Sequence, residues 1–359
     1  MWTDRSDQVE PDDVLLRRER GLGRVVLNRP KAINALTHAV VERIDAALTD
    51  WAADDDVRAV VISGAGERGL CAGGDLRGFH ADAVSGGTGT LDFWRDEYAL
   101  DAHVARYPKP YVAIMDGIVM GGGVGVSAHG GVRVVTERTR LAMPEVGIGL
   151  VPDVGGTYLL TRAPGELGTH LALTATAIGA GDAIACGFAD HFVPSDRLPD
   201  FLDALAVDVD DAVRAFSLPA PPADLPGERE WIDRCYAADS VEEVVANLLD
   251  LGSPDAKDAA ERILGKSPTA LKVTLESLRR ARELETVEQA LVQEYRVSTA
   301  CLRTPDLAEG IRAQVIDKDR APRWTPSTLE EVTDAAVEDF FAPLGDRELV
   351  LPPRATRGT

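Results

Sequence analysis

The chain of 359 residues is poor in positive charge and contains no long apolar run. Its 38 lysine and arginine residues face 59 aspartate and glutamate residues, which gives a net charge of −21. Because nucleic-acid affinity rests on basic patches that contact phosphates, this balance argues against a nucleic-acid partner. No apolar run approaches the roughly 20 residues that span a bilayer, so we expect no membrane partner.

Cysteine and histidine are also scarce. The four cysteines, Cys71, Cys186, Cys235 and Cys301, show no paired spacing for a metal or redox site, and we interpret them as small buried residues. The six histidines are scattered, and none lies in a hydrolase-type motif beside a serine or cysteine. We therefore predict no Ser-His triad and no metal site.

The N-terminal segment MWTDRSDQVEPDD is acidic and lacks the apolar core of a secretion signal. It is equally unlike an arginine- and serine-rich transit peptide. From these features we predict a cytoplasmic protein.

The chain is 45% hydrophobic and long enough to bury a sizeable core. Apolar strand-like segments alternate with glycine-rich turns and helical patterns over 14–198, which predicts an α/β core. A mainly helical region follows over 199–346, with a Pro-rich linker at 217–228. Within it, a predicted helix over 286–303 carries an apolar stripe with one embedded acid, Glu294. We predict flexible ends at 1–13 and 347–359.

Two glycine-rich turns each follow a predicted strand and precede a predicted helix. They are AGGD at 72–75 and MGGGVGV at 120–126, and both let the backbone approach a ligand with exposed N–H groups. Neither matches a dinucleotide fingerprint or a phosphate-binding P-loop. Together they suggest two halves of a device that stabilises an oxyanion in acyl chemistry. Either turn alone could be an ordinary strand-to-helix connection.

The stretch MPEVGIGLVPDVGG (143–156) holds two carboxylates, Glu145 and Asp153, with only apolar residues, glycine and proline between them. Acidic side chains are almost never fully buried unless paired, so an apolar corridor with two of them is unusual. A solvated turn with both acids pointing outward is one interpretation. A buried pair of acids that does chemistry is the other.

Four motifs then occur in order: LNRPKAINAL (27–36), CAGGDL (71–76), GIVMGGGVG (117–125) and MPEVGIGLVPDVGG (143–156). On these motifs the chain resembles the crotonase (enoyl-CoA hydratase/isomerase) superfamily over about 14–263. The resemblance implies the α/β ClpP/crotonase fold, in which stacked ββα repeats form two nearly perpendicular sheets, followed by a helical C-terminal region. Within the superfamily the chain is most similar to the subgroup that hydrolyses 3-hydroxyisobutyryl-CoA, a match that extends through 97–118 and 294–324.

The resemblance assigns roles to individual residues. It implies that the backbone N–H groups of Gly74 and Gly122 bind the thioester carbonyl oxygen. Hydratases of the superfamily use two glutamates, whose positions here are Gly125 and Glu145. A single carboxylate cannot easily activate water and also deliver a proton to the α-carbon, so Gly125 speaks against hydration. The hydrolase subgroup has the same glycine, keeps the glutamate and adds an aspartate, which here is Asp153.

The acyl pocket implied by the subgroup is formed by Glu97, Gly122, Glu145 and Asp153. Glu97 lies in a predicted helix and could instead be a surface acid. Three acids in one pocket repel one another, so we expect their pKa values to split and at least one acid to stay protonated near neutral pH.

We therefore predict hydrolysis of a short branched 3-hydroxyacyl-CoA, with 3-hydroxyisobutyryl-CoA of valine catabolism as the substrate that the resemblance implies. An enoyl-CoA hydratase or isomerase and an inactive acyl-CoA-binding protein are the alternatives. No cofactor is expected, because CoA is part of the substrate, and the superfamily's trimers suggest a homo-oligomer. A protein of this charge must gather cations locally for the CoA phosphates; the candidates are Arg29, Lys31, Arg77, Lys318 and Arg320.

Overall fold

The computed structural model describes residues 13–351. The predicted flexible N-terminus (1–13) therefore lies almost wholly outside the described residues, and so does most of the predicted tail (347–359). The start of that tail is packed onto the molecule: Glu348 accepts a hydrogen bond from Arg296 at 3.0 Å, and Leu349 is 4% exposed.

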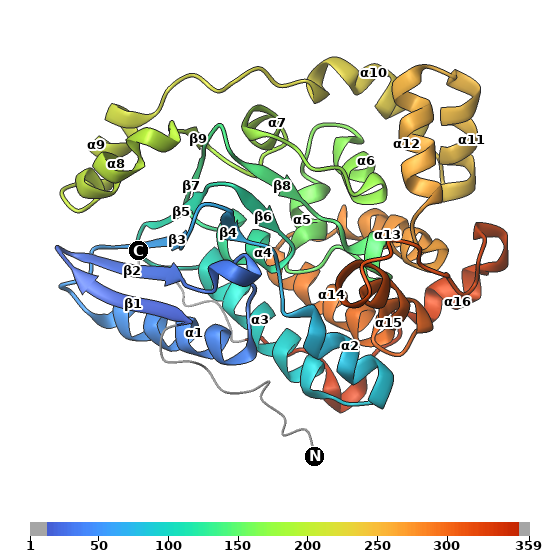
Figure 1. The fold of residues 1–359 in the computed structure, drawn as a ribbon, viewed down its shortest axis with the longest axis horizontal. Coiled ribbons are helices and arrows are strands. Elements are labelled where there is room, and N and C mark those ends of the chain that lie inside the picture. Colours follow the sequence, from blue (N-terminus) through green and yellow to red (C-terminus); the bar gives the residue numbers. More distant parts are fainter. Residues whose placement is uncertain (1–12, 352–359) are drawn as a thin grey trace.

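Two sheets form the core (Figure 1). The larger has the strand order β1-β2-β3-β5-β7-β9 and the smaller has the order β4-β6-β8. The β1–β2 hairpin is antiparallel, and every other strand pair is parallel. The strands are β1 Val14–Glu19, β2 Leu22–Leu27, β3 Ala59–Gly64, β4 Gly69–Cys71, β5 Tyr111–Met115, β6 Ile118–Met120, β7 Val132–Val135, β8 Arg140–Ala142 and β9 His191–Phe192.

The chain alternates between the sheets. The strands β3, β5 and β7 of the large sheet are followed by β4, β6 and β8 of the small one, and helices follow β4 and β6 directly. This order confirms the predicted ββα repeats, two sheets and α/β class. The segment 132–143 forms two short strands, β7 and β8, one in each sheet. Both glycine-rich turns follow strands of the small sheet and therefore come to the same edge.

Sixteen helices lie within the described residues. They are α1 His38–Ala53, α2 Leu76–Ser85, α3 Gly89–Ala105, α4 Gly122–Ala128, α5 Gly156–Leu160, α6 Leu167–Thr174, α7 Ala180–Ala185, α8 Leu198–Leu205, α9 Val209–Phe216, α10 Leu225–Tyr236, α11 Val241–Leu251, α12 Pro254–Leu264, α13 Pro268–Ala281, α14 Val287–Cys301, α15 Pro305–Ile311 and α16 Asp334–Asp339. A π-helix at Arg312–Ile316 and a 3-10 helix at Glu145–Ile148 are short additions that reach the candidate site.

The large sheet is buried on both faces, as its nearly continuous apolar strands require. Alternate residues of β3, such as Val60 and Val61, belong to different clusters. Val60 packs in the main core with α1 and α3, whereas Val61 packs in a smaller cluster with α8 and α9. These two helices therefore cover the second face of the sheet, although they lie beyond the predicted end of the core at Leu198.

The C-terminal helices fold back onto the core. α14 packs against α3 and α5, and α15 packs against α2 and the 3-10 helix at Glu145–Ile148. In Figure 1 α14 and α15, at the orange to red end of the colour range, lie beside the cyan helices α2 and α3. The C-terminal region therefore reaches the loops in which the sequence placed the catalytic residues.

Candidate active site

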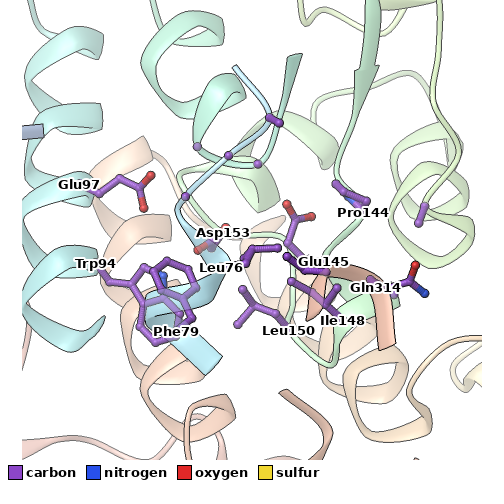
Figure 2. A pocket seen from close by; sticks show the side chains of 18 of the residues that line it. Leu76, Phe79, Trp94, Glu97, Pro144, Glu145, Ile148, Leu150, Asp153 and Gln314 are labelled. Atoms are coloured by element: carbon purple, nitrogen blue, oxygen red, sulfur yellow. The ribbon is translucent and has the colours of Figure 1, made fainter. Parts of the chain in front are cut away.

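A cavity of about 320 Å³ opens where the two glycine-rich turns meet the 143–156 loop (Figure 2). Gly74 and Gly122 line it, and so do Glu97, Glu145 and Asp153. All five residues that the resemblance assigned to chemistry or acyl binding therefore face one cavity. The apolar part of the wall comes from Leu76, Phe79, Trp94, Ile148 and Leu150.

Gly74 and Gly122 can both offer a free N–H to a ligand. Gly74 forms an isolated bridge with Leu36, which uses the carbonyl of Gly73 and the N–H of Asp75 and leaves the N–H of Gly74 unused. Gly122 is the first residue of α4, where a helix leaves its N–H groups without an intrahelical partner. This arrangement can hold a developing oxyanion.

The middle glycine of MGGG must be a glycine for steric reasons. A Cβ added at Gly122 would lie 2.3 Å from Oε1 of Glu97 and 3.1 Å from Cδ1 of Leu36. The preceding Gly121 has φ +50°, and its Cβ would lie 3.2 Å from Oε1 of Glu145. The turn therefore brings bare backbone against two acids of the cavity.

Glu145 begins the 3-10 helix and is 5% exposed. Its Oε2 is buried and has no hydrogen-bond partner among the described residues. Burial in the cavity, and then the charge of Asp153, raise the pKa of Glu145 well above its ordinary value. Because Glu145 lines the cavity and its Oε2 has no protein partner among the described residues, this oxygen can interact with a bound substrate, as a nucleophile or base must.

Asp153 is held by a tyrosine that the sequence interpretation did not single out. The hydroxyl of Tyr98 on α3 donates to Oδ2 of Asp153 at 2.7 Å, and the carboxyl is 5% exposed. Burial raises the pKa of Asp153 to about 6, and the hydrogen bond from Tyr98 opposes that rise. The hydrogen bond from Tyr98 therefore favours the ionised form of Asp153.

The backbone after Asp153 is strained. Val154 has φ +54°, a left-handed conformation that a β-branched residue rarely adopts. Its carbonyl accepts a hydrogen bond from Nε2 of His129 at 2.8 Å. Burial lowers the pKa of His129 to about 4, so this imidazole is neutral and donates through Nε2–H. The surrounding residues therefore fix the loop in a conformation that it would not choose alone.

Glu97 and Asp101 lie one turn apart on α3. Glu97 is 2% exposed and points into the cavity in Figure 2, so the alternative of a surface acid is wrong. Asp101 does not line the cavity and is fully buried, and neither of its oxygens has a hydrogen-bond partner among residues 13–351. Burial first, and then neighbouring acidic charges, raise the pKa of both carboxyls well above the ordinary range.

None of the five predicted phosphate contacts lines the cavity. Arg29 is bound at the surface, with its guanidinium 3.2 Å from Asp75 and 3.4 Å from Asp13. Lys31, Arg77, Lys318 and Arg320 are exposed. Of the described lining residues, the single cation is Lys266, two residues before α13, and Gln314 of the π-helix also lines the cavity. Burial lowers the pKa of Lys266, and Arg262 lowers it further.

The fold assembles one group that sequence spacing did not indicate as a metal site. His38 and Glu42 on α1 meet Asp96 on α3, with their ligand atoms within 4.8 Å of one another and His38 Nε2 2.5 Å from Asp96 Oδ2. Glu42 is exposed, and the other two side chains are part-exposed. Surface groups of this kind are common without an ion, and we assign none here.

The chain belongs to the enoyl-CoA hydratase/isomerase family, whose model matches residues 22–341. A protein from Gallus gallus named 3-hydroxyisobutyryl-CoA hydrolase, mitochondrial, is 42% identical over 94% of this chain and 91% of its own length. Among solved structures, one described as a carnitinyl-CoA dehydratase from Mycobacterium thermoresistibile is 55% identical, with a TM-score of 0.92 over 94% of this chain and 98% of that chain. A Rhodobacter sphaeroides structure described as an enoyl-CoA hydratase is 44% identical, with a TM-score of 0.89 over 94% of this chain and all of that one.

These comparisons confirm the predicted fold and family and correct the predicted location. The curated relatives are named as mitochondrial, so the prediction of a cytoplasmic protein is wrong. Acidic composition constrains the ligands of a protein and does not distinguish one aqueous compartment from another. As for membranes, we find no helix within 13–351 with the length and apolar character needed to cross one.

Proposed function

We propose that this chain hydrolyses the thioester of a short branched 3-hydroxyacyl-CoA, with 3-hydroxyisobutyryl-CoA as substrate, an intermediate of valine catabolism. The observation that carries the proposal is the pair of residues at 125 and 153. Gly125 stands where a hydratase has its first glutamate, and the carboxyl of Asp153 lines the same cavity as that of Glu145. The names of the curated relatives support the same substrate.

In the proposed reaction, the thioester oxygen accepts hydrogen bonds from the N–H groups of Gly74 and Gly122. These donors stabilise the charge that appears when the carbonyl carbon becomes tetrahedral, and one such donor is worth about 2.7–4 kcal/mol in other enzymes. The carbon–sulfur bond then breaks, and the CoA thiolate leaves and takes up a proton. No cofactor takes part in the proposed chemistry.

Glu145 has two possible roles in this scheme. As a nucleophile, its carboxylate forms a mixed anhydride with the acyl group, and water then hydrolyses the anhydride. As a general base, it takes a proton from water, whose oxygen attacks the thioester directly. The family resemblance favours the nucleophile. Trapping of an acyl-enzyme with hydroxylamine would distinguish this role from that of a base.

Asp153 and Glu97 are proposed to hold the 3-hydroxyl of the substrate and to assist proton transfer. Glu97 has an unpartnered Oε1 and a raised pKa, so in its protonated form it can donate a hydrogen bond to the hydroxyl. Asp153, whose ionised form is favoured by the hydrogen bond from Tyr98, can accept one. Both acids line the cavity and can therefore reach the same hydroxyl of a bound acyl chain (Figure 2).

The test is release of free CoA thiol from 3-hydroxyisobutyryl-CoA. We expect turnover by the unmodified protein and loss of at least about 10²-fold in Glu145→Gln and Asp153→Asn with the fold intact, as for other groups that act directly in catalysis. Because the charge of Asp153 helps to raise the pKa of Glu145, any residual activity of Asp153→Asn should have its acidic limb at lower pH. Wild-type turnover by either variant would overturn the assignment.

A hydratase or dehydratase is the second candidate, and the descriptions of the two solved structures above favour it. It predicts a change in enoyl absorbance with crotonyl-CoA or a 3-hydroxyacyl-CoA and no release of thiol. The site speaks against it, because only Glu145 remains of the two acids that such a reaction needs. An inactive acyl-CoA-binding protein would bind CoA esters and change neither signal.

A further inference from the structure

The embedded acid of α14, Glu294, lies against the loop that carries Asp153. Its side chain is 1% exposed, in the middle of an otherwise apolar stripe. Oε2 accepts a hydrogen bond from the N–H of Gly155 at 2.6 Å. Oε1 accepts from both the N–H of Thr157, at 2.9 Å, and its hydroxyl, at 2.5 Å. One carboxylate thus binds three donors within four residues of Asp153.

The hydrogen bonds that Glu294 accepts replace a local cap. Gly155 is the N-cap residue of α5 and has φ +75°, and no side chain of the segment itself caps that helix. The first N–H groups of a helix need an acceptor, and here a residue 139 positions later supplies one. The left-handed Val154 lies between this cap and Asp153, so the cap fixes the strained part of the loop.

The next turn of α14 is linked to the side chain of Asp153 through Tyr98. Ser298 lies 3.0 Å from the hydroxyl of Tyr98, which in turn donates to Asp153. Because the Tyr98 proton is committed to Asp153, Ser298 must be the donor to Tyr98 whenever Asp153 is ionised. α14 therefore holds Asp153 at two points: the backbone through Glu294 and the carboxyl through the Ser298–Tyr98 pair.

Stability alone does not account for an acid at this place in the stripe. Burial raises the pKa of Glu294 to about 7, against the effect of its hydrogen bonds from Thr157 and Gly155, and the charge of Asp153 adds to the rise. Two other acids also interact with its charge, namely Asp101 from α3 and Glu145 from the catalytic loop (143–156). Burial of a carboxylate among other acids lowers the stability of the fold. An apolar residue would avoid that cost but could not accept the hydrogen bonds from Gly155 and Thr157.

We propose that Glu294 and Ser298 are positioning residues for Asp153, so that the helical C-terminal region sets the geometry of the catalytic loop. The inference rests on the proposed function, in which Asp153 acts on the substrate. Neither residue lines the cavity, so the proposal predicts an effect on turnover with little effect on binding. A displacement of about 1 Å in a catalytic group can reduce the rate about 10²-fold.

The experiment compares Glu294→Gln with Glu166→Gln in CoA release from 3-hydroxyisobutyryl-CoA. Glu166 is a matched control: it is also buried and also accepts several hydrogen bonds, but its partners are Thr169, Arg279 and Arg282. We expect Glu294→Gln to lower kcat by about 10- to 100-fold with KM within threefold, because an amide cannot accept from all three donors. The control should keep kcat within twofold of the wild-type value.

Thr157 provides a test that does not depend on the folding of Glu294→Gln. Thr157→Val removes only the hydroxyl donor and should lower kcat, whereas Thr157→Ser keeps it and should restore kcat. Because both residues act through one contact, the double variant Glu294→Gln/Thr157→Val should be no slower than Glu294→Gln alone. Ser298→Ala should lower kcat by a smaller factor and shift the pH profile, because Tyr98 is then less well aligned on Asp153.

Hydrogen exchange over 153–160 measures the loop without reference to activity. Glu294→Gln should exchange these amides at least tenfold faster than Glu166→Gln does. Unchanged exchange, unchanged kcat, an equal kcat loss in the control, or losses that multiply in the double variant would each refute the proposal. A wild-type protein that releases no CoA would instead refute the proposed function, and the same variants would then be compared in crotonyl-CoA hydration.

Discussion

Replacement of Asp101 by asparagine should stabilise the protein, and the gain should grow with pH. Asp101 is fully buried on α3, and neither carboxyl oxygen has a hydrogen-bond partner within the described part of the chain. Burial first, and then the charges of Glu97, Asp153 and Glu294, raise its pKa well above the ordinary value. We therefore expect the carboxyl to be protonated in the folded protein at pH values where the unfolded chain is ionised.

The sign and size of the effect follow from proton linkage. Above the unfolded pKa of about 3.9, the folded state binds one proton more at this site than the unfolded state does, so a rise in pH favours unfolding. The slope is about 1.4 kcal/mol per pH unit for one group. Asparagine has nearly the same shape and no proton to bind. The free energy of unfolding of the variant, relative to wild type, should therefore increase as the pH rises from 5, by at most about 1.4 kcal/mol per pH unit.

Urea unfolding at pH 5, 6 and 7 measures this difference directly. Both the protonated acid and the amide leave polar atoms unpaired, and that cost is an offset that does not change with pH. A constant difference between variant and wild type across the three pH values would show that Asp101 does not change its protonation on folding. CoA release by the variant should stay near the wild-type rate, because Asp101 does not line the cavity.

Three further changes have clear expected outcomes. Lys266→Ala should raise KM for the acyl-CoA about 10- to 100-fold with a nearly unchanged kcat and a weaker salt dependence, because this lining cation can contact an anionic part of CoA. Steady-state kinetics at two salt concentrations measure both effects, and an unchanged KM would contradict the prediction. Gly125→Ala should cost about 1–3 kcal/mol in urea unfolding, because its Cβ would lie 2.6 Å from Asp101 and 2.8 Å from Cβ of Val154; a variant of wild-type stability would contradict this. Glu166→Gln should destabilise by about 1–3 kcal/mol at pH 7. Burial opposes but does not outweigh the hydrogen bond from Arg282 and other contacts that lower the pKa of Glu166, so its contribution exists above the unfolded pKa and is lost as pH falls through the lower folded value; equal destabilisation at pH 3 and pH 7 would refute it.

The fold could be predicted from the sequence because its repeats are local. Each ββα unit is formed by a continuous segment whose pattern is visible in the sequence: an apolar strand, a glycine-rich turn and an amphipathic helix. Helix caps are local in the same way: the side chain of Thr37, the N-cap of α1, accepts a hydrogen bond from the N–H of Val40. The convergence of the two glycine-rich turns also followed from sequence, because both belong to neighbouring strands of one small sheet.

The residues that sequence analysis missed are those whose role depends on distant partners. Tyr98 follows directly after Glu97, but only the packing of α3 against the catalytic loop brings its hydroxyl to Asp153. Lys266 lies outside the matched motifs, and it reaches the cavity because α13 begins beside the 145–148 turn. Basic residues near the matched motifs were preferred instead, and Arg29 turned out to be bound by Asp13 and Asp75.

Asp101 and Gly125 are sterically coupled. The carboxyl of Asp101 fills the space in which any side chain at 125 would have to begin, and Val154 closes that space from the other side. Restoring a glutamate at 125 alone would therefore collide with α3 and with the residue that follows Asp153. A side chain at 125 therefore requires Asp101 or Val154 to shift, which couples this position to α3 and to the loop that carries Asp153.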